Sequence, residues 1–598
     1  MSRSADEHAD LSPEEGDKIR AEALAATSDD LPPGYYRSPR VVATFAAITL
    51  NLMAVYFGFL ASAAALSSII EEFGPSSDSA LFSTAFTTAQ AISTFLMGGI
   101  TDRFGRRPYV VGTNLLGVVS AIVACTSKNL GTLIGANVLA GLAGGQASSY
   151  ILFVGELMSN KYKFIGTIIV AFPSLVATGL GPYFGQRLGM QGDWRWIYYI
   201  QLIMLAIASI LSFVFYHPPS FVQLHGKKVS KMEELKRFDW IGGLLLIASL
   251  ALFLLGISWG GSPGNGWESA KILGLLISGA VSTVSFILYE VFSNVQRPII
   301  PMRFFRDLRG FSCIVGYSAT MGLLNIALQI MYPLQVTRIF GSSLKAEEIS
   351  WMSATSSLGT WFGIVTFGYF FHHIRHIRIQ LLVGACWATS FLAAMSSITM
   401  EDKAKAIAFS FMAGMAIGWG QDVTMLLVQY IISDEDMGTG FSIVSGLRQV
   451  FGSILTAAFI ALHTNKLPGE IKSHLAPAVT KAGLDDSSVP ELLQAAQSGS
   501  AELMAAVPGM TADLLKVAND ALSDSYSAAY AYVYYFAAAL GVFLIGSSLL
   551  AQDFDQYLTS HVSRRIYKQG ETGEDVLDSD SSGPVPLKGA SVEEKGLP

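Results

Sequence analysis

The stretch GGITDRFGRRP, residues 98–108, sets four charged side chains between two long apolar runs. Its pattern is built on Gly98, Asp102, Arg103, Gly105, Arg106 and Arg107. The glycines permit a tight turn and close approach of helices. The arginines suit anionic headgroups at the inner membrane face, and Asp102 can cap a helix N-terminus or pair with an arginine. The stretch predicts a charged turn between two membrane helices; a positive loop that only orients the chain is the alternative.

The rest of the chain has the composition of a multi-pass membrane protein. Of its 598 residues, 51% are hydrophobic and 14% are charged, whereas soluble proteins carry about 25% charged residues. The mean hydropathy is +0.44. Apolar runs long enough to cross a bilayer core of about 30 Å recur along the sequence. We expect no signal peptide, because residues 1–40 are polar and acidic. The three cysteines are far apart and indicate neither a disulfide framework nor a metal site.

The hydrophobic pattern predicts an all-α protein with fourteen membrane spans. They cover 41–62, 79–100, 109–127, 130–157, 165–185, 195–216, 239–260, 269–291, 310–332, 349–371, 379–398, 405–431, 440–463 and 528–550. Both termini are expected in the cytoplasm, because most Lys and Arg residues then flank the inner ends. The tails, 1–40 and 551–598, are rich in Ser, Pro, Asp and Glu, which predicts disorder.

The pattern at 98–107 resembles the signature loop of major facilitator superfamily transporters. At the corresponding place in the second half, GYFFHHIRHIR (368–378) keeps Gly368 and the positive charge but lacks the acid, as a degenerate repeat would. GLGPYFG ends the fifth span, and its Gly181, Pro182 and Gly185 are similar to the Gly-Pro kink motif of antiporters. Gln186 stands where that motif has another glycine.

Three further stretches narrow the resemblance: GELMSNKYKF (155–164), DWRWIYYI (193–200) and DWIGGLLLIASLALFLLGISWGG (239–261). The chain looks like a fourteen-helix drug:proton antiporter, most like the fungal trichothecene efflux pump family, whose relatives include siderophore–iron transporters. Two departures stand out. Asn137 occupies a position where drug antiporters carry arginine, and the first span has no aspartate.

The resemblance implies a division of the chain. It gives an N-terminal six-helix half (41–216), a basic cytoplasmic linker (217–238) and a two-helix insert (239–292). A C-terminal six-helix half (310–550) follows and contains a long extracellular loop (465–525) of Ala- and Leu-rich helical stretches broken by prolines. By the same resemblance, the 98–107 motif gates the switch between inward and outward states.

Polar side chains on the helices that the resemblance makes central are candidates for binding substrate. They are Asn51, Tyr56, Gln146, Tyr150, Asn325, Gln329 and Gln421. Polar groups facing lipid are costly, so these should point inward; hydrogen bonding between helices is the alternative role. Trp351, Trp361, Trp387 and Trp419 are candidates for stacking. Such a site suits a bulky, oxygenated, mostly neutral molecule.

Asp422 and Arg448 are the acid and the base well inside the second half. With a helical rise of 1.5 Å per residue, they lie about 13 Å and about 12 Å from the inner ends of consecutive spans. We therefore expect them to touch or to share a water-filled cavity. A permanent ion pair is one interpretation; the other is that Asp422 exchanges its arginine partner for a proton during transport.

The sequence thus predicts a secondary active exporter of toxic or secondary-metabolite organic compounds, coupled to protons; uptake of a ferric siderophore is the alternative. We expect a monomer in the cell membrane, with the vacuolar membrane as the second possibility. The expected partners are a small organic substrate, protons and the lipid bilayer, with no nucleic acid. No enzymatic activity, cofactor or metal is expected, because the cluster of His372, His373 and His376 lacks a fourth ligand.

Overall fold

The computed structural model describes residues 26–27, 34–74, 81–219, 231–260, 266–293, 295, 298–341, 343–498, 501–555 and 561–562. Most of both tails, predicted to be disordered, and residues 220–230 of the predicted linker lie outside these residues. Within them the protein is helical, apart from a two-residue antiparallel pair that joins β1 (Ala26–Thr27) to β2 (His561–Val562).

The helices are α2 (Pro39–Ala64), α3 (Leu66–Phe73), α4 (Leu81–Phe104), α5 (Arg106–Cys125), α6 (Leu130–Ser148), α7 (Tyr150–Gly155), α8 (Lys163–Ser174), α9 (Gly181–Met190), α10 (Arg195–Phe215), α12 (Lys231–Arg237), α13 (Trp240–Trp259), α14 (Ala270–Phe292), α15 (Cys313–Phe340), α16 (Ala346–Ile374), α17 (Ile377–Ala394), α18 (Lys403–Ile431), α19 (Met437–Lys481), α20 (Val489–Ser498), α21 (Ala501–Ala505) and α22 (Ala512–Leu550). The short helices are η2 (Tyr35–Arg37), η3 (Asn160–Tyr162), η4 (Leu175–Gly179), η5 (Met302–Arg306), η6 (Leu308–Ser312) and η7 (Met395–Ser397).

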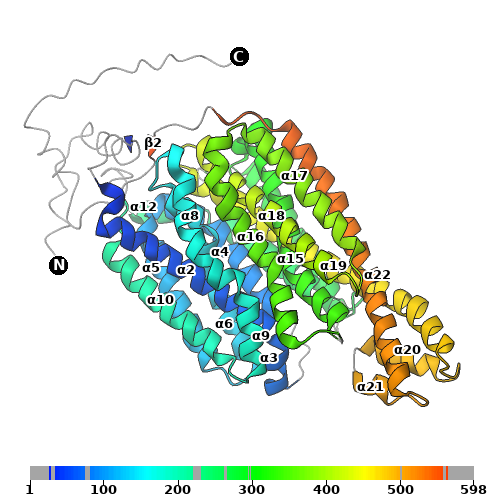
Figure 1. Cartoon of the computed structure of the whole chain (residues 1–598). Helices are drawn as coiled ribbons and strands as arrows, with labels where there is room; N and C mark the ends of the chain where they lie inside the picture. Colours follow the sequence, from blue (N-terminus) through cyan, green and yellow to red (C-terminus); the bar gives the residue numbers. More distant parts are fainter. Residues whose placement is uncertain are drawn as a thin grey trace, which may run out of the picture.

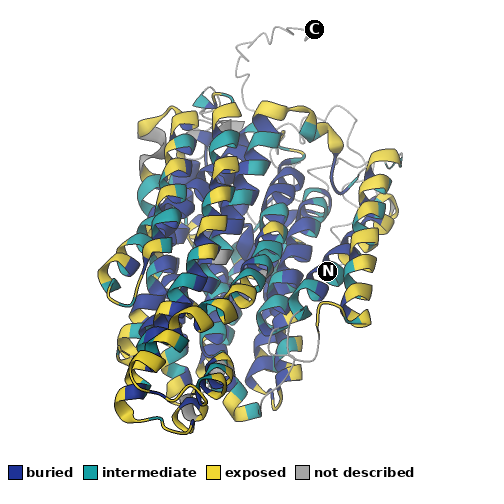
Figure 2. Ribbon diagram, turned by 90° about the vertical axis from the view of Figure 1, so that its right-hand side faces the viewer, coloured by how far each residue is buried: buried dark blue, intermediate teal, exposed yellow. Residues whose placement is uncertain are grey.

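The long helices pack into two groups (Figure 1). In the first group, α2–α10, α2 packs on α10 and α6 lies against α4 and α5. In the second group, α15–α22, α16 packs on α18, while α22 contacts α15, α17 and α19. The groups meet where α4 packs on α19 and where α16 packs on α8, η4 and α9. Buried residues line the inner faces of the helices and exposed residues lie mainly outside (Figure 2).

Twelve helices in the described part of the chain are long and apolar enough to cross a membrane. The predicted spans 79–100 and 349–371, which correspond to α4 and α16, are not among these twelve. Both are long helices, of 24 and 29 residues. Each packs on helices of both groups, α4 on α6 and α19, α16 on α18 and α8. A helix that faces protein on several sides can carry more small and polar residues than one that faces lipid.

The predicted loop 465–525 forms a helical cap, and its first two prolines do not break the helix as expected. The helix α19 continues through Pro468 and Pro477 to Lys481, and α22 begins at Ala512. Together with α20 and α21 they enclose a separate hydrophobic core, and they project from one end of the bundle (Figure 1). Its members on α19, Ile471, Leu475 and Val479, recur every four residues and so share one helix face. This packing outweighs the helix-breaking tendency of the two prolines.

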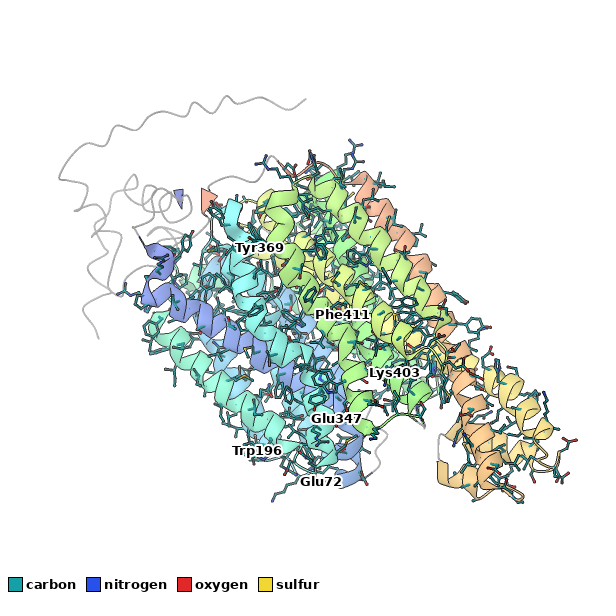
Figure 3. The ribbon with its side chains drawn as sticks, viewed as in Figure 1. Glu72, Trp196, Glu347, Tyr369, Lys403 and Phe411 are labelled. Carbon is teal, nitrogen blue, oxygen red and sulfur yellow. The ribbon has the colours of Figure 1, made fainter. Side chains whose placement is uncertain are left out.

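The DWRWIYYI stretch anchors α10 to α3. Glu72 accepts a hydrogen bond from the Trp194 indole nitrogen at 2.6 Å and pairs with Arg195 at 2.9 Å. The Trp194 hydrogen bond, and to a smaller extent Arg195, hold the pKa of the Glu72 carboxyl below its usual value. Figure 3 shows Glu72 and Glu347 near one end of the bundle and Tyr369 toward the other.

Candidate functional site

The Asp102 carboxylate contacts the N-terminus of α19. It accepts hydrogen bonds from the Gly438 backbone nitrogen at 3.1 Å, the Thr439 backbone nitrogen at 2.6 Å and the Thr439 hydroxyl at 2.9 Å. These amides have no partner within their own helix, and the helix dipole favours an anion there. The motif therefore joins the first group to the second, at what we call the motif end of the bundle.

Arg106 is fully buried and holds two carboxylates of the first group. It pairs with Asp102 at 2.7 Å and with Glu156, just after α7, at 2.5 Å. Its Nε donates to Glu156 at 3.0 Å, and its guanidinium also donates to the Thr101 hydroxyl. Buried charges persist when they are paired and hydrogen-bonded. The network fixes Asp102 in the orientation that meets α19.

The other motif residues shape the turn or the helix contact. A Cβ added to Gly98 would collide with the Gly438 carbonyl and the Ser442 hydroxyl, so α4 and α19 touch there only because Gly98 has no side chain. Gly105 has φ +90°, a conformation that favours glycine. The guanidinium of Arg103 lies 5.4 Å from the Phe238 ring centroid, and Arg107 donates to the Phe213 carbonyl at 2.9 Å.

Helix α18 makes a further contact with the first group at the motif end. Gln429 donates to the Ile151 carbonyl at 3.0 Å, and the Tyr430 hydroxyl donates to the Asn160 carbonyl at 3.0 Å. Lys163 is fully buried, and its Nζ lies 5.4 Å from the centroid of the Tyr430 ring. The motif end is thus held together by two separate helix contacts, on α19 and on α18.

The groups also touch at the opposite end, through the antiporter kink motif. Gly181 and Pro182 begin α9 directly after the π-helical turn η4, and Gly185 lies against the Ala61 backbone of α2. The contacts across the groups come from Tyr183, within the motif, and from Gln186, which follows Gly185. Ser350 of α16 donates to Gln186 Oε1 at 2.5 Å, and the Trp351 and Tyr183 ring centroids are 4.5 Å apart. Gln186, the departure from the motif, therefore makes a contact that glycine could not.

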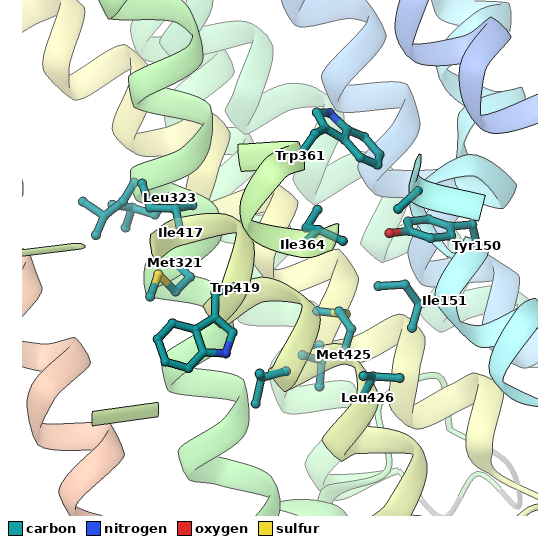
Figure 4. Close-up of a cluster of buried hydrophobic side chains, with 14 of the residues drawn as sticks. Tyr150, Ile151, Met321, Leu323, Trp361, Ile364, Ile417, Trp419, Met425 and Leu426 are labelled. Atoms are coloured by element: carbon teal, nitrogen blue, oxygen red, sulfur yellow. The ribbon is translucent and has the colours of Figure 1, made fainter. Parts of the chain in front are cut away.

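Asp422 lies in the C-terminal half of α18 and is almost completely buried. Neither of its carboxylate oxygens has a hydrogen-bond partner among the described residues. A Cβ added to Gly368 of α16 would lie 3.1 Å from its Oδ2. Tyr150 of α7 lies within electrostatic reach, and its buried hydroxyl also lacks a partner; Figure 4 shows that hydroxyl directed toward Ile364. An unpartnered buried carboxylate is costly, so this one requires a proton, a water or a ligand.

Arg448 does not pair with Asp422 in this structure. Its Nη1 instead lies 3.5 Å from Gln421 Oε1. Successive residues of an α-helix point about 100° apart, so Gln421 faces α19 while Asp422 faces α16. The two residues therefore form no ion pair here, and the alternative expectation of a shared water-filled cavity stays a prediction; Tyr150 lies within electrostatic reach of both charges.

The seven predicted substrate residues divide into two sets. Asn51 donates to Asn114 Oδ1 at 2.6 Å, and Gln146 accepts from the Thr113 hydroxyl at 2.8 Å. Both are buried between helices of the first group, which favours the alternative role of hydrogen bonding between helices. The remaining five are Tyr56, Tyr150, Asn325, Gln329 and Gln421.

Each of these five residues has a link to Arg448. Gln421 contacts it, Tyr56 and Tyr150 lie within its electrostatic reach, and Asn325 and Gln329 lie on α15, which it contacts. Gln329 donates to Asn325 Oδ1 at 3.2 Å on α15. The side chain of Arg448 packs against Gly322 on the same helix, three residues before Asn325 and thus on the same face. Among the tryptophans, Trp419 stacks on Phe367 at 4.3 Å, within the protein rather than toward this cluster.

Sequence reasoning gave no role to Glu156, Lys163 or Gln186, all of which lie at contacts between helices. Glu156 and Lys163 belong to GELMSNKYKF, and charged residues at the end of an apolar run are a usable signal. For the histidine cluster, the side chains of His372 and His373 lie outside the described residues, and His376 lies 3.7 Å from Asp555. The described side chains include no group of three or more metal-ligating residues.

Two packed groups of long apolar helices, joined at both ends around a polar cluster, define a membrane-spanning transporter. The sequence profile of the family described as "Fungal trichothecene efflux pump (TRI12)" matches residues 2–595. The trichothecene efflux pump TRI12 of Trichoderma arundinaceum is 54% identical, covering 96% of this chain and 97% of that protein. The protein of the same name from Fusarium sporotrichioides is 52% identical, covering 97% and 98%.

A more distant relative is the MFS-type transporter prx5 of Penicillium rubens, 24% identical over 75% of this chain and 81% of that protein. The chain belongs to the fungal trichothecene efflux pump family. The resemblance read from the sequence motifs is confirmed, and the protein is a membrane-spanning efflux transporter.

Proposed function

We propose that this protein exports a trichothecene or a closely related toxic secondary metabolite by proton antiport. The observation that carries the proposal is 54% identity to a trichothecene efflux pump over 96% of the chain. The polar cluster supports it, because phenol, amide and guanidinium groups suit a bulky, oxygenated and mostly neutral molecule. The residues proposed to contact substrate are Tyr56, Tyr150, Asn325, Gln329 and Gln421; Asn51 and Gln146 are left out because each is engaged with a neighbouring helix.

The proposed arrangement in the membrane has fourteen spans, with α4 and α16 completing the twelve apolar helices. Two six-helix halves, 41–216 and 310–550, flank the insert formed by α13 and α14, and the motif end faces the cytoplasm. The distribution of Lys and Arg supports this orientation. Both termini are then cytoplasmic. The protein acts as a monomer in the cell membrane, with the vacuolar membrane as the alternative site.

The transport cycle alternates between contacts at the two ends of the bundle. Contact of Asp102 with α19 closes the cytoplasmic side, and contact of Gln186 with Ser350 closes the outer side. Breaking one set while keeping the other opens the polar cluster to one face of the membrane at a time. Hydrogen bonds at both ends can be exchanged for bonds to water, which supports their role as reversible contacts.

Asp422 is the proposed proton carrier. It is buried beside Gly368 and Tyr150 with both oxygens unpartnered, and it borders the same region as Arg448. Approach of Arg448 would stabilise the charged carboxylate, and its withdrawal would favour protonation. Substrate movement that displaces Arg448 would thereby couple to proton binding.

An accumulation assay in a host that lacks its own pumps tests the function. Cells that express the protein should retain less of a labelled trichothecene than cells with an empty vector, and an uncoupler of the proton gradient should abolish the difference. A strain that expresses the Asp422→Asn variant at equal level serves as the control. Iron-dependent accumulation of a ferric siderophore, with no effect on the toxin, would instead establish the uptake alternative.

A further inference from the structure

Several hydrogen-bond donors of the polar cluster lack an acceptor among the described residues. Arg448 carries five N–H donors, and its hydrogen bond to Gln421 Oε1 is long, at 3.5 Å. The Gln421 amide nitrogen and the Tyr150 hydroxyl are buried without a partner among the described residues. Because Arg448 can only donate, the oxygen of the Gln421 amide faces it and the amide nitrogen points away. Donors from α7, α18 and α19 are thus left unsatisfied.

Of these donors, Arg448 keeps accessible surface inside the bundle, while the Gln421 nitrogen and the Tyr150 hydroxyl are buried beside it. Arg448 contacts Gly322 of α15 and Gln421 of α18, and the hydroxyls of Tyr56 on α2 and Tyr150 on α7 lie within its electrostatic reach. Although four helices surround it, Arg448 is only half-buried. Because helices enclose Arg448, its accessible surface faces the interior of the bundle and not the outside. Tyr56, Asn325 and Gln329, which are also half-buried, lie around the same region.

We propose that Arg448 and Gln421, assisted by the Tyr150 hydroxyl, form a subsite that recognises acceptor oxygens of the exported molecule. Carbonyl, ester and ring-ether oxygens satisfy unpaired N–H and O–H groups, and a hydrogen bond to a charged donor is among the stronger ones in proteins. A hydroxyl on the same skeleton fits less well, because its own proton faces other donors. An organic cation is disfavoured by the charge of Arg448. The inference rests on the proposed export of a trichothecene-like compound.

The test measures equilibrium binding to the purified full chain. The two probes are a trichothecene that carries an acetyl ester and the same molecule with that ester hydrolysed to a hydroxyl. Arg448→Met, which keeps an unbranched side chain but removes all donors, should weaken binding of the ester about tenfold or more. Binding of the hydroxyl analogue should change by less than about threefold. Arg448→Lys, which keeps the charge but loses the planar pair of donors, should show a partial loss.

A matched control is Arg338→Met, the same substitution at an exposed arginine of α15 whose guanidinium lies 5.7 Å from the Tyr526 ring centroid. It should bind both probes as the unaltered protein does. If Arg448→Met does not fold, Gln421→Met reports on the same subsite and should also lower the ratio of ester to hydroxyl affinity. Equal loss for both probes, or no loss for either, would overturn the subsite while leaving the export function intact. Binding of neither probe to the unaltered protein would overturn the proposed function and this subsite with it.

Discussion

Gln421 and Asp422 are adjacent in sequence, but Gln421 faces α19 and Asp422 faces α16. The proposed substrate contact and the proposed proton carrier therefore lie on different faces of α18. The proposal for Asp422 predicts that Asp422→Asn abolishes transport driven by a pH gradient in proteoliposomes. Asparagine has the shape of a protonated carboxyl but cannot release a proton, so exchange of labelled for unlabelled substrate should continue. Glu401→Gln, which removes an exposed acid just before α18, should leave both activities unchanged. Gradient-driven transport by Asp422→Asn would exclude Asp422 as the proton carrier.

Gly98 offers a second prediction at the scale of one residue, with its neighbour as control. A Cβ at Gly98 meets the Ser442 hydroxyl and the Gly438 carbonyl, whereas a Cβ at Gly99 meets only the Phe238 ring, at 3.9 Å. Gly98→Ala should therefore shift the population away from the state in which α4 contacts α19, and Gly99→Ala should not. Distances between spin labels on the motif ends of α4 and α19 measure the shift. A similar distribution in both variants would mean that the close approach at Gly98 does not limit closure.

The sequence predicts how deep in the membrane a side chain lies better than it predicts which neighbouring helix that side chain faces. The sequence allows Asp102 to cap a helix N-terminus or to pair with an arginine, and in the structure it does both, with α19 and Arg106. Similar depth along two helices predicts that Asp422 and Arg448 touch or share a cavity; they form no ion pair here, because Arg448 contacts Gln421. Residue spacing gives depth, but the direction of a side chain around its helix depends on how that helix is rotated by its neighbours.

At the scale of elements, the N-terminus of α19 supplies the amides that bind Asp102. Asp102→Asn removes the charge that interacts with the helix dipole and weakens three hydrogen bonds, a loss of about 1–3 kcal/mol from the closed motif end. Transport should slow, while substrate affinity stays nearly constant because Asp102 lies far from the polar cluster. Initial rates and equilibrium binding measured on the same preparation separate the two effects. A decrease in affinity of more than about tenfold, or ~1.4 kcal/mol, would be evidence against a gating role.

The contact between α9 and α16 predicts the reciprocal behaviour at the other end. Gln186→Gly restores the glycine of the kink motif and removes the hydrogen bond with Ser350. The variant should spend more time open on the side opposite the motif end, so a membrane-impermeant thiol reagent should label the cysteine of Leu358→Cys, which faces Gly179 of the first group, faster. Ser350→Ala should have a similar effect, and the double variant should add little, because both substitutions remove one interaction. Additive effects of the two changes would show that Gln186 acts through another contact.

Element boundaries were predicted well where apolar runs end in charged turns and poorly where helices leave the expected membrane zone. The turn between α4 and α5 follows from Gly105, which has a positive φ. The extension of α19 to Lys481 was missed, because Pro468 and Pro477 normally end helices. The apolar face of Ile471, Leu475 and Val479 was present in the sequence, but its partner surface on α20 and α22 is formed only by the folded cap.

On the scale of the whole molecule, the cap and the membrane bundle have separate hydrophobic cores. The cap core, which includes Leu475, Leu492 and Leu514, forms one cluster, and the core between the two helical groups forms another. They are connected mainly through the continuous helices α19 and α22. Loss of packing in the cap should consequently remain local, because cooperative units in proteins commonly follow such clusters.

Leu492→Ala tests this independence. Leu492 is fully buried in the cap, so its truncation should destabilise that core by about 2–5 kcal/mol. Hydrogen exchange should then rise across 471–521 while the membrane parts of α18 and α19 keep their protection, and substrate affinity should be unaffected. Leu503→Ala is the matched control, since Leu503 is 54% exposed and its truncation leaves no cavity. If Leu492→Ala also increased exchange around Asp422, the cap and the transport core would form one cooperative unit, and the cap would contribute directly to the stability of the transport site.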